Sequence, residues 1–276
     1  MNYKIVTDSS ADTLSYEGIS FASAPLKIIT DNKEYIDDES LDVEAMLSEL
    51  KTYKGKSHTS CPSTGDYLTA FEGAENIFCI TITSGLSGSF NAASTAAKMF
   101  LEEHPECNIH VIDSLSTGPE NYLLIRKLAE LCGEGLDFNA VKEKITEYHN
   151  HTRLIFALES MHNLANNGRV SHLVAKMAGL LGIRAVGRAS DVGTLEMTGK
   201  SRGAAATVKD IFTNMKAEGY SGGRVRIHHA VNPDAAENLK NKIKGEFPDA
   251  DVTVDTAGGL CSFYAESGGL LIGFEI

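Results

Sequence analysis

The segment that decides the fold is Ile77-Phe78-Cys79-Ile80-Thr81-Ile82-Thr83-Ser84-Gly85-Leu86-Ser87-Gly88-Ser89-Phe90. Its first seven residues are almost all apolar or β-branched, which predicts a buried β-strand. A loop of glycines and serines follows, and from Gly88 to His104 the apolar residues have the spacing of an amphipathic helix. A strand that runs through such a loop into a helix is typical of α/β proteins, which bind ligands at this edge of the sheet.

The segments on both sides of this unit repeat the alternation of strand and helix. Residues 3–7 predict a strand that the turn formers Asp8-Ser9-Ser10 close, and residues 108–112 predict another. A helix is expected over 119–132, with Thr117 and Pro119 as its start signal. This order predicts a mostly parallel sheet flanked by helices, and we assign residues 1–152 to an N-terminal α/β domain.

The second half of the chain predicts another α/β unit. Residues 154–158 form an expected strand, 171–181 a helix of small residues, and 182–197 a hairpin that turns at Asp191-Val192-Gly193. Helices over 203–218 and 233–245 then alternate with strands over 224–229, 250–255 and 269–275. We assign residues 153–276 to a C-terminal α/β domain with a mixed sheet, packed directly on the first domain.

Composition excludes several classes of protein. The chain has 276 residues, is 42% apolar, and carries 25 basic against 37 acidic residues, a net charge of −12. This charge disfavours nucleic acid and anionic lipid surfaces as partners. We expect no transmembrane segment and no secretory signal. The five cysteines include no Cys-x-x-Cys pair, the histidines fit no metal spacing, and both features favour a cytoplasmic protein without a metal.

Two hydroxyl-rich segments are the candidates for ligand binding. The loop at residues 84–89 precedes a helix start, where free backbone amides and the helix dipole favour an anion. The second segment is Thr59-Ser60-Cys61-Pro62-Ser63-Thr64-Gly65, a predicted turn before a helix that Ser63 or Thr64 caps. We expect both segments to converge on one oxyanion. The alternatives are capping of the local backbone by these hydroxyls and, for Cys61, a small packed residue, which we prefer to a nucleophile.

A serine hydrolase is the alternative function. Gly85-Leu86-Ser87-Gly88-Ser89 nearly matches the Gly-x-Ser-x-Gly elbow, but its last residue is serine. Such enzymes also need a late histidine as general base, and none follows His229. A dinucleotide site is disfavoured because no Gly-x-Gly-x-x-Gly follows the first strand.

The sequence resembles the DegV family of bacterial fatty-acid-binding proteins across essentially its whole length. The matching segments are residues 6–12 (Val-Thr-Asp-Ser-Ser-Ala-Asp), 59–63, 84–89, 113–120 (Asp-Ser-Leu-Ser-Thr-Gly-Pro-Glu), 167–171 (Asn-Gly-Arg-Val-Ser) and 201–203 (Ser-Arg-Gly). At 59–63 the family has Thr-Ser-Gln-Pro-Ser. The family shares its fold with the substrate domain of dihydroxyacetone kinases.

The resemblance implies a carrier, not an enzyme, that buries one long-chain fatty acid in a tunnel between the domains. Thr59 and Ser87 would bind the carboxylate, and Ser60 and Gly88 would line the same pocket. A separate fatty acid kinase would phosphorylate the bound acid for phospholipid synthesis, with Arg169 and Arg202 serving this exchange. No cofactor is implied. The tail channel could be lined by the small apolar residues Ala175, Ala178, Gly179, Leu180 and Leu181. A helix that is simply buried against the sheet would have the same pattern.

One segment departs from the family pattern. Where the family has His-x-Gly-Pro-Gly-x-x-Gly, this chain has Glu266-Ser267-Gly268-Gly269-Leu270-Leu271-Ile272-Gly273. This match places Glu266 at the head group, where a second carboxyl would share a proton with the ligand and impair phosphotransfer. The alternative is that the altered loop turns Glu266 away from the pocket.

Overall fold

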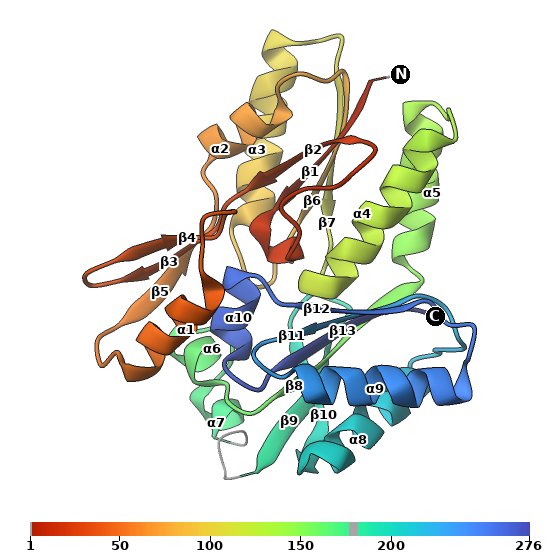
Figure 1. Ribbon diagram of the computed structural model, residues 1–276. Coiled ribbons are helices and arrows are strands. Elements are labelled where there is room, and N and C mark those ends of the chain that lie inside the picture. The colour runs from red at the N-terminus through yellow and green to blue at the C-terminus, as the bar shows by residue number, and fades with distance from the viewer. Residues whose placement is uncertain (1, 177–181) are drawn as a thin grey trace.

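The computed structural model describes residues 2–176 and 182–276, and its chain is divided between two main sheets that lie one above the other in Figure 1. The N-terminal sheet contains β1 (Tyr3–Asp8), β2 (Ser20–Ala24), β6 (Asn76–Thr81) and β7 (Asn108–Asp113) in the order β2-β1-β6-β7. Every neighbouring pair is parallel, as the alternation of strands and helices predicted.

Helices cover both faces of this sheet (Figure 1). Alternate strand residues face opposite sides, so Ile5 and Phe78 pack against α4 (Gly118–Gly133) and α5 (Phe138–His149). Val6 and Cys79 pack on the other side against α2 (Thr64–Phe71) and α3 (Ser89–Glu103). The predicted strands and helices of this half are therefore confirmed to within two residues at most ends.

A small antiparallel sheet, β4-β3-β5, projects from the N-terminal half (Figure 1) and was absent from our prediction. It contains β3 (Lys27–Thr30), β4 (Glu34–Ile36) and β5 (Ser57–Ser60), and α1 (Val43–Thr52) packs beside it. Ile28, Tyr35 and Met46 form its apolar core with Phe263 from the C-terminal half. The predicted turn at Thr59 and Ser60 is thus the end of a strand, and Ser63 caps α2 with a capping box, as expected.

The C-terminal sheet is mixed, as predicted, in the order β10-β9-β8-β13-β11-β12. Only the β11–β12 pair among its described pairs is parallel. Its strands are β8 (Thr152–Leu158), β9 (Ile183–Ala189), β10 (Leu195–Arg202), β11 (Val225–His229), β12 (Val252–Thr256) and β13 (Leu270–Glu275). Ile155 and Ala157 face α8 (Ala204–Ala217) and α9 (Pro233–Glu246), whereas Leu154 and Phe156 face the opposite way, toward the N-terminal half.

The remaining elements of the described chain are short. They are the 3-10 turn η1 (Ser9–Ala11), α6 (His162–Asn166), α7 (His172–Ala175) and α10 (Gly259–Ala265). Asp12 follows η1, and its Oδ2 lies 2.7 Å from His228 Nδ1, both side chains being almost fully buried. The Asp37 carboxylate accepts hydrogen bonds from the amides of Gly259 (2.8 Å) and Leu260 (3.0 Å). The N-terminal half therefore holds the first turn of α10 in place. Of the predicted helix at 171–181, the structure has α7, and residues 177–181 lie outside the described residues.

Candidate ligand-binding cavity

A cavity of about 550 Å³ lies between the loops of the N-terminal half and the inner face of the C-terminal sheet. This volume falls within the usual range for small-molecule sites. Most of the wall is apolar: Leu26, Ile82, Leu115, Leu154, Phe156, Leu158, Leu164, Leu195, Leu260 and Leu271. The polar part is built from β5, the loop before α3, the residue Arg169 and α10. The cavity therefore has an apolar body with a few polar groups.

The two hydroxyl-rich segments meet in this wall. Thr59 and Ser60 end β5, Ser87 and Gly88 precede α3, and all four residues line the cavity. A Cβ atom placed on Gly88 would lie 3.3 Å from Cys61 Sγ, so the two segments are in direct contact. The Gly88 amide has no hydrogen-bond partner in the described part of the chain. Hydroxyls and a free amide at a helix start are the donors that an anion needs.

Close packing holds the 84–88 loop in place. Thr83 Oγ1 donates to the carbonyl of Gly193 (2.8 Å), and the Ser84 amide donates to Asp113 Oδ1 (3.0 Å). A Cβ on Gly85 would lie 2.8 Å from the Gly193 carbonyl oxygen, which leaves no room for a side chain there. The hairpin between β9 and β10 thus fixes the position from which Ser87 faces the cavity.

The Asp8-Ser9-Ser10 signature has a structural role beside this loop. The buried Asp8 carboxylate accepts a hydrogen bond from the Ile82 amide (2.9 Å) and another from Ser89 Oγ, at the first residue of α3. Burial raises the pKa of Asp8. This side chain connects β1 to the start of α3 and is absent from the cavity wall.

Tyr264 is a polar residue of the cavity that the sequence analysis missed. Its hydroxyl lies 2.7 Å from Thr59 Oγ1, and burial raises the pKa of Tyr264, so the phenol stays protonated at neutral pH. Arg169 lies nearby, with its guanidinium carbon 5.8 Å from the centre of the Tyr264 ring. Arg169 donates to the carbonyls of Leu86 (3.2 Å) and Asn167 (2.6 Å) and forms no ion pair within the described residues. An unpaired cation and three hydroxyls thus surround one end of the cavity.

Glu266 lies outside this cavity, contrary to the position that the sequence match gave it. Its Oε1 accepts a hydrogen bond from the Asn163 amide (3.1 Å), and its side chain lines a separate cleft. The cause is the backbone, because Glu266 ends α10 with φ of +53° and the chain turns away there. Tyr264, two residues earlier and still within α10, reaches Thr59 instead. No local pattern marks Tyr264, because its contact with Thr59 depends on how α10 lies against β5.

Two further predicted residues also lie apart from the cavity. Arg202 is exposed at the end of β10 and is absent from the cavity wall. Ala175 packs on the apolar cluster under β8 and β13 without lining the cavity, and the other proposed tail residues, 178–181, lie outside the described residues.

The geometry around Ser87 differs from that of a nucleophile with a general base. Ser87 Oγ accepts a hydrogen bond from the Ser89 amide (3.3 Å), and no histidine is bonded to it among the residues described. His58 lines the same cavity, whereas His228 is held by Asp12. Residues 2–176 and 182–276 contain neither a cluster of His, Cys, Asp and Glu side chains that could hold a metal ion nor a helix long and apolar enough to cross a membrane.

Comparison with known proteins gives the same family at every level. The profile of the DegV family, described as uncharacterised proteins, matches residues 2–275. A DegV domain-containing protein of Streptococcus pneumoniae is 44% identical over 280 residues, covering all of both chains. The S. pneumoniae fatty acid kinase B3 protein loaded with linoleic acid has a TM-score of 0.98 and 44% identity over 100% of both chains. A DegV family protein of Eubacterium eligens loaded with heptadecanoic acid has a TM-score of 0.97 and 42% identity over 99% of each chain.

Proposed function

Because this chain belongs to the DegV family, we propose that it binds one long-chain fatty acid in the 550 Å³ cavity and presents the carboxylate to a fatty acid kinase. The observation that carries the proposal is the division of the cavity wall into a long apolar part and one polar end. The similarity to two proteins loaded with fatty acids supports the same ligand class.

The carboxylate is bound at the polar end. Ser87 donates a hydroxyl hydrogen bond, and the Gly88 amide adds a backbone donor. Thr59 and Tyr264 are hydrogen bonded to each other, so one of their hydroxyls donates within the pair and the other donates to the carboxylate, while Ser60 lines the pocket. Hydrogen bonds to a charged group are each worth about 1.5–3 kcal/mol, which offsets the cost of removing the carboxylate from water. The tail lies along Leu154, Phe156 and their neighbours, where each buried methylene contributes about 0.8 kcal/mol.

Arg169 and Arg202 have different roles in the proposed phosphotransfer. Arg169 lies at the polar end of the cavity, where its charge stabilises both a carboxylate and an acyl-phosphate. Arg202 is exposed and serves the contact with the kinase. The chain itself supplies no catalytic step and no cofactor, and the fatty acid is its ligand. It acts in the cytoplasm as two domains, 1–152 and 153–276, and its five free cysteines suit that compartment.

The test is to extract the purified protein with organic solvent and identify the bound acid by mass spectrometry. We expect one long-chain fatty acid per protein. The Ser87→Ala variant should bind it at least about tenfold more weakly in a titration, with Ser84→Ala, in the same loop but outside the cavity wall, as the control. If the extract holds no lipid acid and a fluorophosphonate labels Ser87, the hydrolase alternative replaces this proposal.

A further inference from the structure

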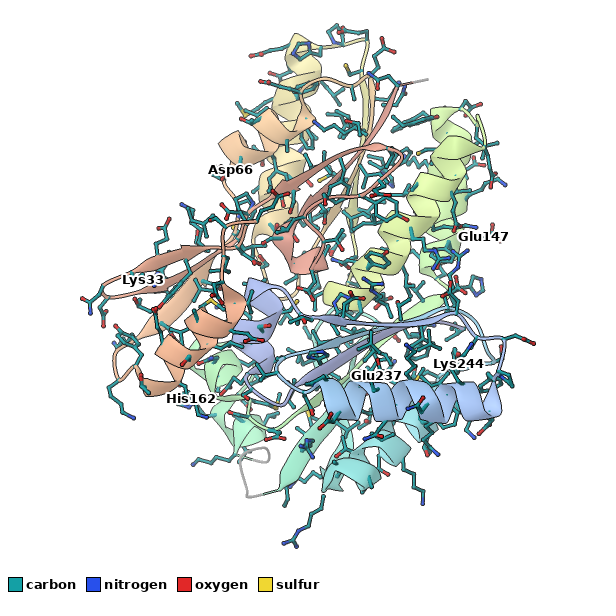
Figure 2. The ribbon with its side chains drawn as sticks, in the orientation of Figure 1. Lys33, Asp66, Glu147, His162, Glu237 and Lys244 are labelled. Carbon is teal, nitrogen blue, oxygen red and sulfur yellow. The ribbon has the colours of Figure 1, made fainter. Side chains whose placement is uncertain are left out.

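A second and larger cleft, of about 1020 Å³, adjoins the lipid cavity. His58 lines both, so the cleft begins at the polar end of the lipid cavity. Its walls are the loop between α1 and β5, the helix α6, and the segment that follows α10. His162, which Figure 2 labels, belongs to α6 and lines this cleft.

The charges in this cleft contrast with the net charge of −12 of the chain. Lys51, Lys54 and Lys56 line one wall, all three are exposed, and none forms an ion pair within the described part of the protein. Three histidines also line the cleft: His58, His162 and His172. Three lysine charges are thus gathered in one cleft of an otherwise acidic protein.

The two acidic residues of the cleft already have partners. Glu159 forms an ion pair with Arg184, which lies outside the cleft wall, and Glu266 accepts the hydrogen bond of the Asn163 amide. Glu266 keeps its charge, because the amide that it binds is neutral, but no carboxylate of the described residues forms an ion pair with any of the three lysines, so these lysines can bind a multiply charged anion.

Hydrogen bonds between neighbouring elements hold the walls of the cleft in place. Asn167 Nδ2 donates to the Ser57 carbonyl (3.3 Å), which ties α6 to β5, and Asn163 Nδ2 donates to the Phe263 carbonyl (2.8 Å), which ties α6 to α10. The lysine loop is fixed from behind, because the Tyr53 hydroxyl donates to Asp31 Oδ2 (2.7 Å). The lysines are thus presented on a loop whose base is anchored.

We propose that this cleft binds a ligand with two or more phosphate groups. Lysine ammonium groups are phosphate binders, and three of them in one cleft supply more positive charge than a single phosphate needs. A nucleoside triphosphate and an inorganic polyphosphate share this chemistry. The contact at His58 places the phosphates beside the polar end of the lipid cavity.

The experiment titrates the full-length protein with sodium tripolyphosphate and, separately, with a nucleoside triphosphate, by calorimetry at physiological ionic strength. We expect the double variant Lys54→Ala/Lys56→Ala to lower the affinity for both by about tenfold or more. Lys51→Glu, which reverses a charge, should weaken binding as strongly. The matched control is Lys142→Ala/Lys144→Ala on the exposed side of α5, with an expected change below about twofold.

The outcomes separate this proposal from the lipid function. Fatty acid content is measured in the same samples and should be equal in all variants, because none of these lysines lines the lipid cavity. Equal affinity for the two probes identifies the phosphates as the recognised part, and tighter binding of the nucleotide adds a contact to the nucleoside. The proposal is overturned if neither probe binds, if both double variants lose affinity equally, or if polyglutamate binds as tightly as tripolyphosphate.

Discussion

Replacing Tyr264 with phenylalanine removes one hydroxyl from the polar end of the lipid cavity and leaves the ring in place. The hydroxyl lies 2.7 Å from Thr59 Oγ1, and its raised pKa keeps it a proton donor at neutral pH. If it donates to the ligand carboxylate, its loss costs about 1.5–3 kcal/mol, which is about 10- to 150-fold in affinity. A fatty alcohol of the same length carries no charge, so the same change should cost only about 0.5–1.5 kcal/mol for that ligand.

The assay is a competition titration of wild-type and variant protein with a fatty acid and with its matched alcohol. Tyr220→Phe is the control, because the Tyr220 hydroxyl donates to the Gly223 carbonyl (3.1 Å) and lies outside the cavity wall. Combining Tyr264→Phe with Thr59→Val should give a loss smaller than the sum of the single losses, since the two hydroxyls are hydrogen bonded. Equal losses for acid and alcohol, or no loss at all, would refute the assignment of Tyr264 to the head group.

Four further predictions follow from the same geometry. Lengthening the saturated ligand from 12 to 16 carbons should raise affinity by about 0.8 kcal/mol per methylene until the cavity is filled, as a series of competition titrations would show. Glu266→Gln should leave both the fatty-acid affinity and its pH dependence unchanged between about pH 6 and 8, because Glu266 lies outside the cavity; a variant that differs from the wild type at either pH would contradict this. Arg202→Ala should leave fatty-acid affinity unchanged while lowering acyl-phosphate formation by a cognate kinase, whereas Arg169→Ala should lower both. Burial raises the pKa of Asp37 to about 6, so the protonated carboxyl stabilises the folded state relative to the unfolded state. This contribution is fully present below about pH 4 and is lost as the pH rises through 6. Asp37→Asn should therefore remove about 3 kcal/mol of the pH dependence of the unfolding free energy, measured by denaturant unfolding.

The sequence predicted the elements whose signals are local. The strand at β6 has a nearly unbroken apolar run, α3 has helical periodicity over four turns, and Ser63 is a cap that the capping box confirms. The sheet β4-β3-β5 was missed because its strands have only three or four residues, too few for a periodic pattern, and because its core is completed by Phe263 from the other half. Its third strand carries Thr59, so the missed sheet is also what positions a candidate ligand donor.

In the candidate site too, residues in local motifs were predicted, and residues whose position depends on the fold were not. Thr59, Ser60, Ser87 and Gly88 were brought together in one wall, and their contact with a ligand stays a prediction. Glu266 was assigned by its place in a motif, but its direction depends on a positive φ and on the short helix α10, neither of which a motif specifies. Tyr264 could not be found without knowing that α10 faces β5, since the two residues that meet are 205 positions apart.

The cavity is lined by the phenol of Tyr264 and not by the carboxyl of Glu266, and this changes the charge that a bound carboxylate would meet. With Glu266 in the wall, an ionised ligand would require a shared proton, and phosphotransfer would face a fixed negative charge. With Tyr264 and Arg169 there instead, the wall offers a neutral donor and a cation, and no acidic side chain lines it among the described residues. Under the proposed function, the carboxylate can then bind ionised, and a phosphoryl group that is transferred to it meets positive rather than negative charge. The departure from the family motif therefore does not itself argue against presentation of the acid to a kinase.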